Sequence, residues 1–153
     1  MHEVLAIMGS PRKGDTYHLT QQIEATMSGL GDVEFDYLWL RDADLQMCRG
    51  CYACLERSEE DCPLDDDRSE IEQRMLEADG VIFASPVYAM NMTALMKNLF
   101  DRLAYTMHRP RFFHQRALIV VSAGAAGINE TQDALAAVRY MGFDMSGGRL
   151  GMQ

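Results

Sequence analysis

The 153-residue sequence lacks several features that would place it in a familiar class of protein. It has no run of eighteen apolar residues, which excludes a transmembrane helix. Acidic residues outnumber basic residues by 23 to 14, and a net charge of −9 repels nucleic acids and anionic membranes. Aromatic residues make up 8% of the chain with a single Trp, so no platform for stacking nucleic-acid bases is indicated.

Catalytic and targeting signatures are also scarce. The four histidines are scattered, and without a Ser-His-Asp or Cys-His arrangement hydrolase chemistry has no candidate residues. We find no internal repeat, low-complexity tract or linker, and the length allows one domain over residues 1–153. The N-terminus MHEVLAIMGS has no basic flank and runs into a Gly-Ser-Pro turn. We therefore expect a first strand there instead of a signal peptide, and a cytoplasmic location.

What the sequence does contain is an alternation of strand-like and helix-like segments. Short apolar runs that end at Gly, Ser or Pro predict strands, and apolar residues three or four positions apart predict helices. The expected strands are residues 3–8, 33–40, 80–85 and 117–122, and the expected helices are residues 16–30, 69–78, 92–103 and 129–141. Only residues 144–153 remain for a fifth strand, so we expect either a sparsely completed sheet edge or a chain that is cut short.

This order of segments predicts an α/β protein in which a doubly wound parallel sheet lies between two layers of helices, a three-layer α/β/α arrangement. Most of the expected strands are almost entirely apolar, as in a sheet that is covered on both faces. The strand at 33–40 is mixed, which suits a position nearer the edge. Ser69 and Glu72 have the spacing of a capping box, which predicts the start of the helix at 69–78.

Three of the expected strand ends carry unusual loops, at residues 9–16, 85–91 and 122–127. The carboxyl ends of parallel strands meet at one edge of a sheet, where such proteins bind their ligands. The first loop, GSPRKGDT, leads into the start of a helix, whose free N–H groups and dipole attract phosphate. Ser10 and Thr16 add hydroxyl groups and Arg12 adds a guanidinium. The loop matches neither the P-loop nor the Rossmann glycine pattern.

The other two loops suit a flat ligand. In the second loop, SPVYAMN, a stiff backbone lies beside the aromatic ring of Tyr88, and in the third, SAGAAG, small residues let the main chain approach a ligand closely. Each loop alone is equally compatible with an ordinary turn, and it is their convergence that indicates a binding site. Lys97, Asp101 and Arg102, which follow the second loop, are either a solvated ion-pair face or ligand contacts.

All four cysteines fall in one Cys-rich loop at residues 46–66, in the pattern C-x2-C-x2-C-x7-C formed by Cys48, Cys51, Cys54 and Cys62. In a cytosolic chain such clustering favours a metal or redox role over disulfides. The first three share the spacing of bacterial ferredoxin ligands, and a seven-residue arm can bring in the fourth. A zinc site built from four thiolates and a set of metal-free thiols are the two alternatives.

Together, the segments GSPRKGDT, SPVYAMNMTALMKNLFDRL and CRGCYAC…C resemble the NADPH-dependent FMN reductase family, and especially its iron–sulfur flavoprotein branch, over residues 1 to about 143. The resemblance implies a flavodoxin-like fold, bound FMN, NAD(P)H as electron donor and a [4Fe–4S] cluster on the four cysteines. It also assigns positions: Ser10, Arg12, Asp15 and Thr16 to the FMN phosphate, Pro86, Val87, Tyr88, Ala89, Met90 and Asn91 to the isoalloxazine ring, and Ser122, Gly124 and Gly127 to the third FMN-facing loop. Two departures are Asp15, where the family often has Asn, and a shorter C-terminus.

We therefore expect an FMN-dependent NAD(P)H oxidoreductase that passes electrons from a nicotinamide through FMN to a small-molecule or protein acceptor. Because the flavin carries the chemistry, no general acid or base is expected. Backbone N–H groups of residues 87–91 and near Gly124 would stabilise negative charge on the reduced ring. The alternative is a non-enzymatic electron carrier that uses FMN and a [4Fe–4S] cluster, and a flavin- or metal-sensing module is a third reading.

Partners are expected to exclude nucleic acid and membrane. We expect a homodimer or higher homo-oligomer, because a sparse fifth strand leaves apolar cover missing and the Met-rich helix after the second loop offers a surface. The family resemblance implies the same.

Overall fold

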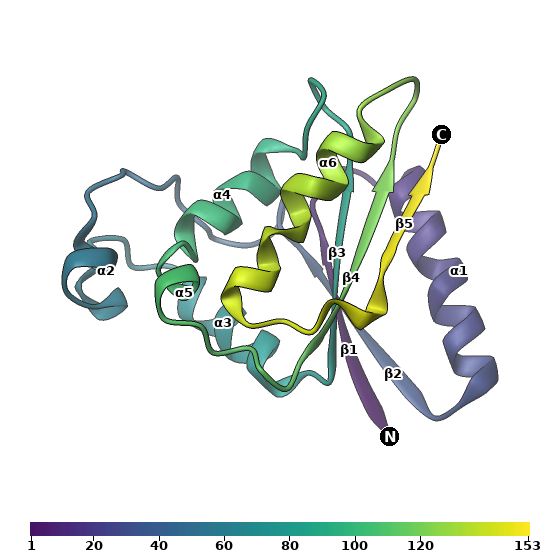
Figure 1. The fold of residues 1–153 in the computed structure, drawn as a ribbon, viewed down its shortest axis with the longest axis horizontal. Coiled ribbons are helices and arrows are strands. Elements are labelled where there is room, and N and C mark those ends of the chain that lie inside the picture. Colours follow the sequence, from purple (N-terminus) through teal and green to yellow (C-terminus); the bar gives the residue numbers. More distant parts are fainter.

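A computed structural model describes all 153 residues and contains a single five-stranded sheet (Figure 1). Its strands are β1 (His2–Met8), β2 (Val33–Trp39), β3 (Gly80–Pro86), β4 (Arg116–Ser122) and β5 (Arg149–Met152). The strand order is β2-β1-β3-β4-β5, and every neighbouring pair is parallel. This is the order of flavodoxin-like sheets, which reverses between β1 and β3. The predicted flavodoxin-like α/β fold is confirmed, with β2 at one edge and a short β5 at the other.

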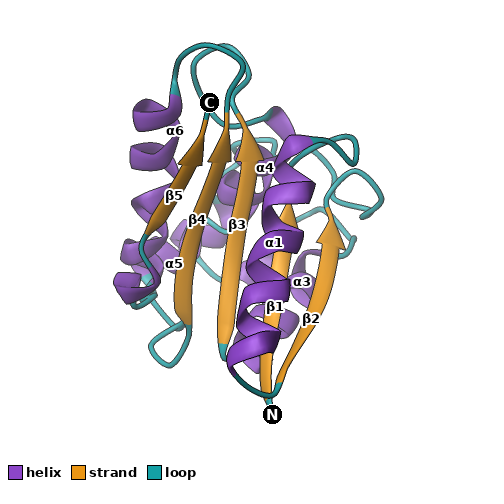
Figure 2. Ribbon diagram, turned by 90° about the vertical axis from the view of Figure 1, so that its right-hand side faces the viewer, coloured by secondary structure: helices purple, strands orange, loops and turns teal.

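Helices cover the two faces of the sheet unequally. They are α1 (Asp15–Leu30), α2 (Ala53–Glu56), α3 (Arg68–Glu77), α4 (Ala94–Arg102), α5 (Tyr105–His108) and α6 (Ile128–Leu135), with 3₁₀ segments at Glu59–Asp61, Ala136–Met141 and Met145–Gly147. Figure 2 shows α1 alone in front of the sheet, while α3, α4, α5 and α6 lie behind it. None of the helices combines the length and the apolar character that crossing a membrane requires.

The apolar core is likewise larger on one face of the sheet than on the other. Alternate residues of each strand point to opposite faces. Leu5 and Ile7 join a cluster of 23 buried residues under α3–α6, whereas Val4 and Met8 join a cluster of only six under α1. On the α1 side, α1 covers β3 and β4, whereas β5 has no helix in front of it (Figure 2).

The predicted capping box at the start of α3 is wrong. The helix begins at Arg68, and its preceding residue Asp67 makes no side-chain cap. The carboxylate of Glu72 accepts hydrogen bonds from Arg68, Arg111 and Tyr105 instead of from the backbone. Two guanidinium groups bind a carboxylate more strongly than a peptide N–H does, so the tertiary partners prevail.

Two other expectations need correction. The helix expected over residues 129–141 is α-helical only to Leu135 and then tightens into a 3₁₀ segment. The Met-rich helix does not offer an apolar surface through its methionines, because Met92 and Met96 are buried in the core. Its apolar stripe faces the sheet, and Thr93 caps the start of α4 by accepting a hydrogen bond from Met96 N at 3.3 Å.

Candidate functional site

The three loops that follow β1, β3 and β4 meet at the carboxyl edge of the sheet, as the sequence predicts (Figure 2). We call residues 9–16, 85–91 and 122–127 together the three-loop edge. Val87 N donates to Ser122 O at 2.8 Å, and the hydroxyl groups of Thr16 and Ser122 are 2.6 Å apart. Thr93 Oγ1 donates to Gly9 O at 2.7 Å and ties the start of α4 to the first loop. The loops therefore form one connected unit.

The first loop has the properties of a phosphate site. The buried Ser10 hydroxyl donates to Arg12 O at 2.7 Å and accepts from Arg12 N at 3.2 Å, so it shapes the loop. The guanidinium of Arg12 and the carboxylate of Asp15 are exposed and make no hydrogen bond or ion pair within the protein. No side chain caps the start of α1, which leaves the N–H groups of its first turn free. Arg41 Nη1 donates to Pro11 O at 2.7 Å and brings a second guanidinium to this loop.

The second loop is a tight reverse turn. Tyr88 N donates to Asn91 O at 2.8 Å and Asn91 N donates to Tyr88 O at 3.1 Å. The two central residues, Ala89 (φ 48°) and Met90 (φ 66°), are left-handed, which is strained for residues with a side chain. Their two N–H groups have no acceptor in the protein, whereas those of Val87, Tyr88 and Asn91 are used. Of the backbone N–H groups of residues 87–91 that were expected to face a ligand, only those of Ala89 and Met90 are free to donate to one.

Gly127 supports the second loop from behind. It is buried with a φ of 94°, and a Cβ there would lie 2.7 Å from Val87 Cγ1 and 3.1 Å from Met90 Cα. Only glycine allows both the backbone angle and the close approach. Gly124 is exposed, and a Cβ there would meet no atom within 4 Å. The two predicted glycines therefore have different surroundings.

The exposed face of the edge carries apolar side chains. Tyr88 and Met90 are 44% and 51% exposed beside the half-buried Pro86 and Val87. A hollow of about 400 Å³ exists elsewhere, at the amino ends of β1, β3 and β4, and none of the three loops lines it. The free N–H groups, the Arg12 guanidinium and the exposed apolar side chains all lie at the three-loop edge.

The Cys-rich loop, with α2 inside it, projects from the body of the molecule (Figure 1). All four cysteines line one hollow of about 30 Å³, and Cys48 and Cys54 also line a second hollow of about 270 Å³. No three metal-binding side chains converge on one ion. The four thiol groups around this hollow are the ligand types that iron–sulfur clusters and zinc sites both use.

Polar side chains of α4 and of the segment after α5 approach three of these cysteines. Asn98 Oδ1 accepts a hydrogen bond from Cys48 N at 3.0 Å, and Arg109 Nη2 donates to Cys54 O at 2.6 Å. Arg102 Nη2 lies 4.0 Å from Cys62 Sγ. Burial, and next the electrostatic interaction with Cys62, raise the pKa of Cys54. The sulfur atoms of the loop are thus close enough to affect one another's charge state.

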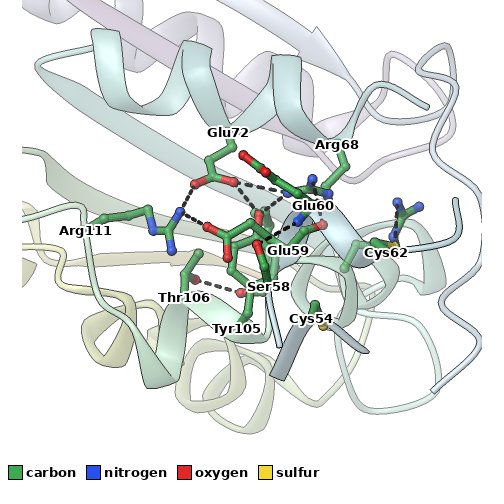
Figure 3. A network of polar contacts seen from close by, with 12 residues as sticks. Cys54, Ser58, Glu59, Glu60, Cys62, Arg68, Glu72, Tyr105, Thr106 and Arg111 are labelled. Carbon is green, nitrogen blue, oxygen red and sulfur yellow. Dashed lines mark hydrogen bonds and ion pairs between the residues drawn. The ribbon is translucent and has the colours of Figure 1, made fainter. Parts of the chain in front are cut away.

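A charged network anchors this loop to the body (Figure 3). Arg111 Nη1 binds Glu59 Oε1 at 2.8 Å and Glu72 Oε1 at 2.7 Å, while the Tyr105 hydroxyl contacts both Glu72 and Arg68. Burial alone would raise the pKa of Glu59, but hydrogen bonds from Arg111, its own backbone and Arg109 outweigh it and lower the pKa to about 2. Burial and then Glu72 raise the pKa of Tyr105.

Sequence reasoning missed most of these anchoring residues. Lys97 and Asp101 do form an exposed ion pair at 2.5 Å, one of the two readings considered. Arg102 is neither a solvated residue nor exposed to a ligand at the three-loop edge, because it is buried against Asp66. Asn98 and Arg102 are four residues apart and flank the apolar stripe of α4, which is the signal that could have identified them.

Comparison with known proteins decides the family. A family model for NADPH-dependent FMN reductase matches residues 2–146. The chain belongs to this family. It is 38% identical over 100 residues to an iron–sulfur flavoprotein of Archaeoglobus fulgidus, covering 65% of this chain and 48% of that protein. It is 41% identical over 101 residues to an iron–sulfur flavoprotein of Methanocaldococcus jannaschii, covering 65% and 51%.

The FMN reductase family resemblance noted in the sequence is thus confirmed, while the chain spans about half the length of these two relatives. Among solved structures, RosB with bound 8-demethyl-8-formylriboflavin-5′-phosphate superimposes with a TM-score of 0.79. The two are 14% identical, and the match covers 99% of this chain and 66% of RosB. At that identity the likeness establishes the fold.

Proposed function

We propose that this protein is an FMN-dependent oxidoreductase that takes electrons from NAD(P)H and passes them to a small acceptor. The observation that carries the proposal is the convergence of three loops with complementary chemistry at one sheet edge. One loop offers a cation and free N–H groups, one offers free N–H groups beside apolar side chains, and one offers exposed small residues. Membership of the FMN reductase family supports it.

The first loop would hold the phosphate. Free N–H groups of the first turn of α1 and the unpaired guanidinium of Arg12 suit an anion, in a chain whose net charge of −9 disfavours anions elsewhere. Asp15 opposes them with an unpaired carboxylate. We expect FMN affinity to reflect the balance of these two charges.

The second and third loops would hold the ring. When bound, FMN supplies a flat system that accepts hydride and releases electrons one at a time. The N–H groups of Ala89 and Met90 would donate to its polar edge, and Tyr88 would cover part of its face. Gly124 leaves open space for the ring.

We further propose that the Cys-rich loop carries a [4Fe–4S] cluster held by Cys48, Cys51, Cys54 and Cys62. Four thiol groups around one hollow, and the iron–sulfur flavoprotein relatives, support this. Helix α4 connects the two sites, since Thr93 contacts the three-loop edge and Arg102 contacts the cysteine hollow. Nine residues of helix separate them along the axis by about 14 Å.

Anaerobic mixing tests the reductase proposal. The full chain is loaded with FMN and mixed with NADPH or NADH while flavin absorbance is followed. Loss of the flavin band on mixing is the expected result, and a protein that binds no FMN at high ligand concentration contradicts the proposal. Stable FMN binding without bleaching by either nucleotide would favour the electron-carrier alternative.

Metal reconstitution tests the cluster. Iron and sulfide are supplied without oxygen, and bound iron, sulfide and FMN are measured in the wild type and in Cys54→Ser. We expect the wild type to take up about four irons and the variant to lose the cluster while keeping FMN. Uptake of zinc in place of iron, or no metal at all, would contradict the assignment.

A further inference from the structure

Arg102 is a buried cation on the wall of the cysteine hollow. It is 3% exposed, and its side chain belongs to the residues that line this hollow together with all four cysteines. Nη1 donates to Gln46 O at 2.7 Å and pairs with Asp66 Oδ2 at 2.5 Å, while Nη2 donates to Asp66 Oδ1 at 2.9 Å. Nε has no partner in the protein.

Asp66 fixes the plane of this guanidinium. The two-pronged pair holds both terminal nitrogens in one orientation. Asp66 is itself fixed, because it accepts hydrogen bonds from Gln46 N at 2.8 Å and Arg68 N at 3.2 Å. Arg102 therefore cannot turn away from the sulfur of Cys62, which lies 4.0 Å from Nη2.

We propose that Arg102 is a positioning residue that donates an N–H···S hydrogen bond to the Cys62 thiolate and thereby raises the reduction potential of the cluster that Cys62 binds. The inference rests on the cluster assignment proposed above. Reduction adds one electron and no atom, so the assembly of iron, sulfide and thiolates becomes one unit more negative. The electron comes from a reductant, dithionite in the test below. A cationic donor at the sulfur stabilises the more negative state, which favours reduction.

Arg68 provides a matched control on the same wall. It also lines the cysteine hollow and carries the same charge. Its guanidinium, however, binds Glu72, the Tyr105 hydroxyl and Glu59 O, and it makes no hydrogen bond to a sulfur atom. An effect of charge or of packing alone should appear in both Arg68→Lys and Arg102→Lys, whereas a hydrogen bond to sulfur should appear only in the second.

The experiment compares Arg102→Lys, Arg68→Lys and the wild type as full chains loaded with FMN and reconstituted anaerobically. Iron and sulfide content and thermal unfolding report the structural effect, and a dithionite titration followed by electron paramagnetic resonance reports the potential. We expect Arg102→Lys to shift the reduction equilibrium at least tenfold toward the oxidised form, which is about 59 mV for one electron. Arg68→Lys should shift it by much less than tenfold.

A second measurement covers the case in which Arg102→Lys fails to hold a cluster. Wild type, Arg49→Lys and Arg68→Lys are labelled with arginine that carries ¹⁵N in the guanidinium only, and pulsed resonance of the reduced cluster is searched for a ¹⁵N coupling. Arg49 also lines the hollow, so a coupling in all three proteins supports the proposal, and its absence from any of them overturns it.

The outcomes separate this inference from the one beneath it. A wild type that takes up no iron removes the cluster assignment and the inference together. A wild type with a cluster whose potential is the same in Arg102→Lys, or shifts equally in both variants, overturns the role of Arg102 and leaves the cluster assignment standing.

Discussion

The three-loop edge and the Cys-rich loop lie at opposite ends of α4 and are held in place by different interactions. At the three-loop edge, strand register and backbone hydrogen bonds such as Val87 N to Ser122 O set the positions. The Cys-rich loop has only a four-residue helix and a three-residue 3₁₀ segment of its own. Buried and half-buried charged side chains of α3, α4 and the α5–β4 connection hold it.

This difference bears on how each site responds to change. Backbone hydrogen bonds persist through most substitutions, whereas a buried ion pair leaves an uncompensated charge when one partner is removed. Single substitutions of charge should therefore disturb the Cys-rich loop strongly, and the three-loop edge should respond to changes of backbone angle or ligand charge.

Asp66→Asn should have the largest effect. It leaves the buried guanidinium of Arg102 without a counter-charge, and we expect the free energy of unfolding to fall by about 3–5 kcal/mol. Urea unfolding followed by circular dichroism measures it. Asp133→Asn breaks an exposed pair with Arg149 and should change stability by less than about 1 kcal/mol. Similar losses in the two variants would show that the buried pair is no more important than a surface pair.

Arg12→Ala should weaken FMN binding and leave riboflavin binding almost unchanged, because the two ligands differ only in the phosphate. A hydrogen bond to an ionised group contributes about 1.5–3 kcal/mol, an affinity loss of about 10- to 150-fold. Arg12 is exposed, so the lower end of this range is expected at high salt. Fluorescence titration with both ligands measures it, and Asp15→Asn should tighten FMN alone. Equal losses for both ligands would place the phosphate elsewhere.

Gly127→Ala tests the backbone requirement at the three-loop edge. An alanine at φ 94° and in contact with Val87 should cost about 1–3 kcal/mol of stability and weaken FMN binding. Gly124→Ala meets no neighbouring atom and should change stability by less than about 0.5 kcal/mol, while it weakens FMN if the ring lies against it. Thermal unfolding and FMN titration of both variants measure this. An unchanged Gly127→Ala protein would refute the close-packing argument.

Acid should loosen the Cys-rich loop, with the smallest effect of the four. The pKa of Glu59 is lowered to about 2 from 4.5, so its contribution to stability is fully present above about pH 4.5 and is lost as the pH falls through 2. Thermal unfolding between pH 5 and pH 2 should show the midpoint falling. The fall should be shallower in Glu59→Gln, whose neutral side chain does not titrate, and parallel curves would count against Glu59.

The sequence predicts the fold and the three-loop edge well because both follow from local patterns. The apolar runs at residues 80–85 and 117–122 are mostly buried on both faces, as in a parallel strand that is covered on both sides. Once the strands are parallel, their carboxyl ends must meet, so the loops converge without further information. The spacing of the cysteines is likewise visible in the chain itself.

The anchoring of the Cys-rich loop was not predictable for a physical reason. Arg111 and Glu59 are 52 residues apart, and in the sequence each looks like any charged surface residue. Periodicity reports which face of an element is apolar, but it does not report which distant charge will be buried beside it. The left-handed backbone conformation of Ala89 and Met90 was equally unpredictable from the sequence, since neither residue type favours it.

The buried contact between Thr16 and Ser122 has a consequence for folding kinetics. It joins residues 106 positions apart, in the first turn of α1 and at the end of β4. Contacts of such long sequence separation form late, because a large loop must close before they are made. During synthesis the first loop emerges early, yet it can acquire its final shape only after β4 has been made. A ligand that binds only the finished edge would then stabilise the last contacts to form, and so favour chains that have completed folding.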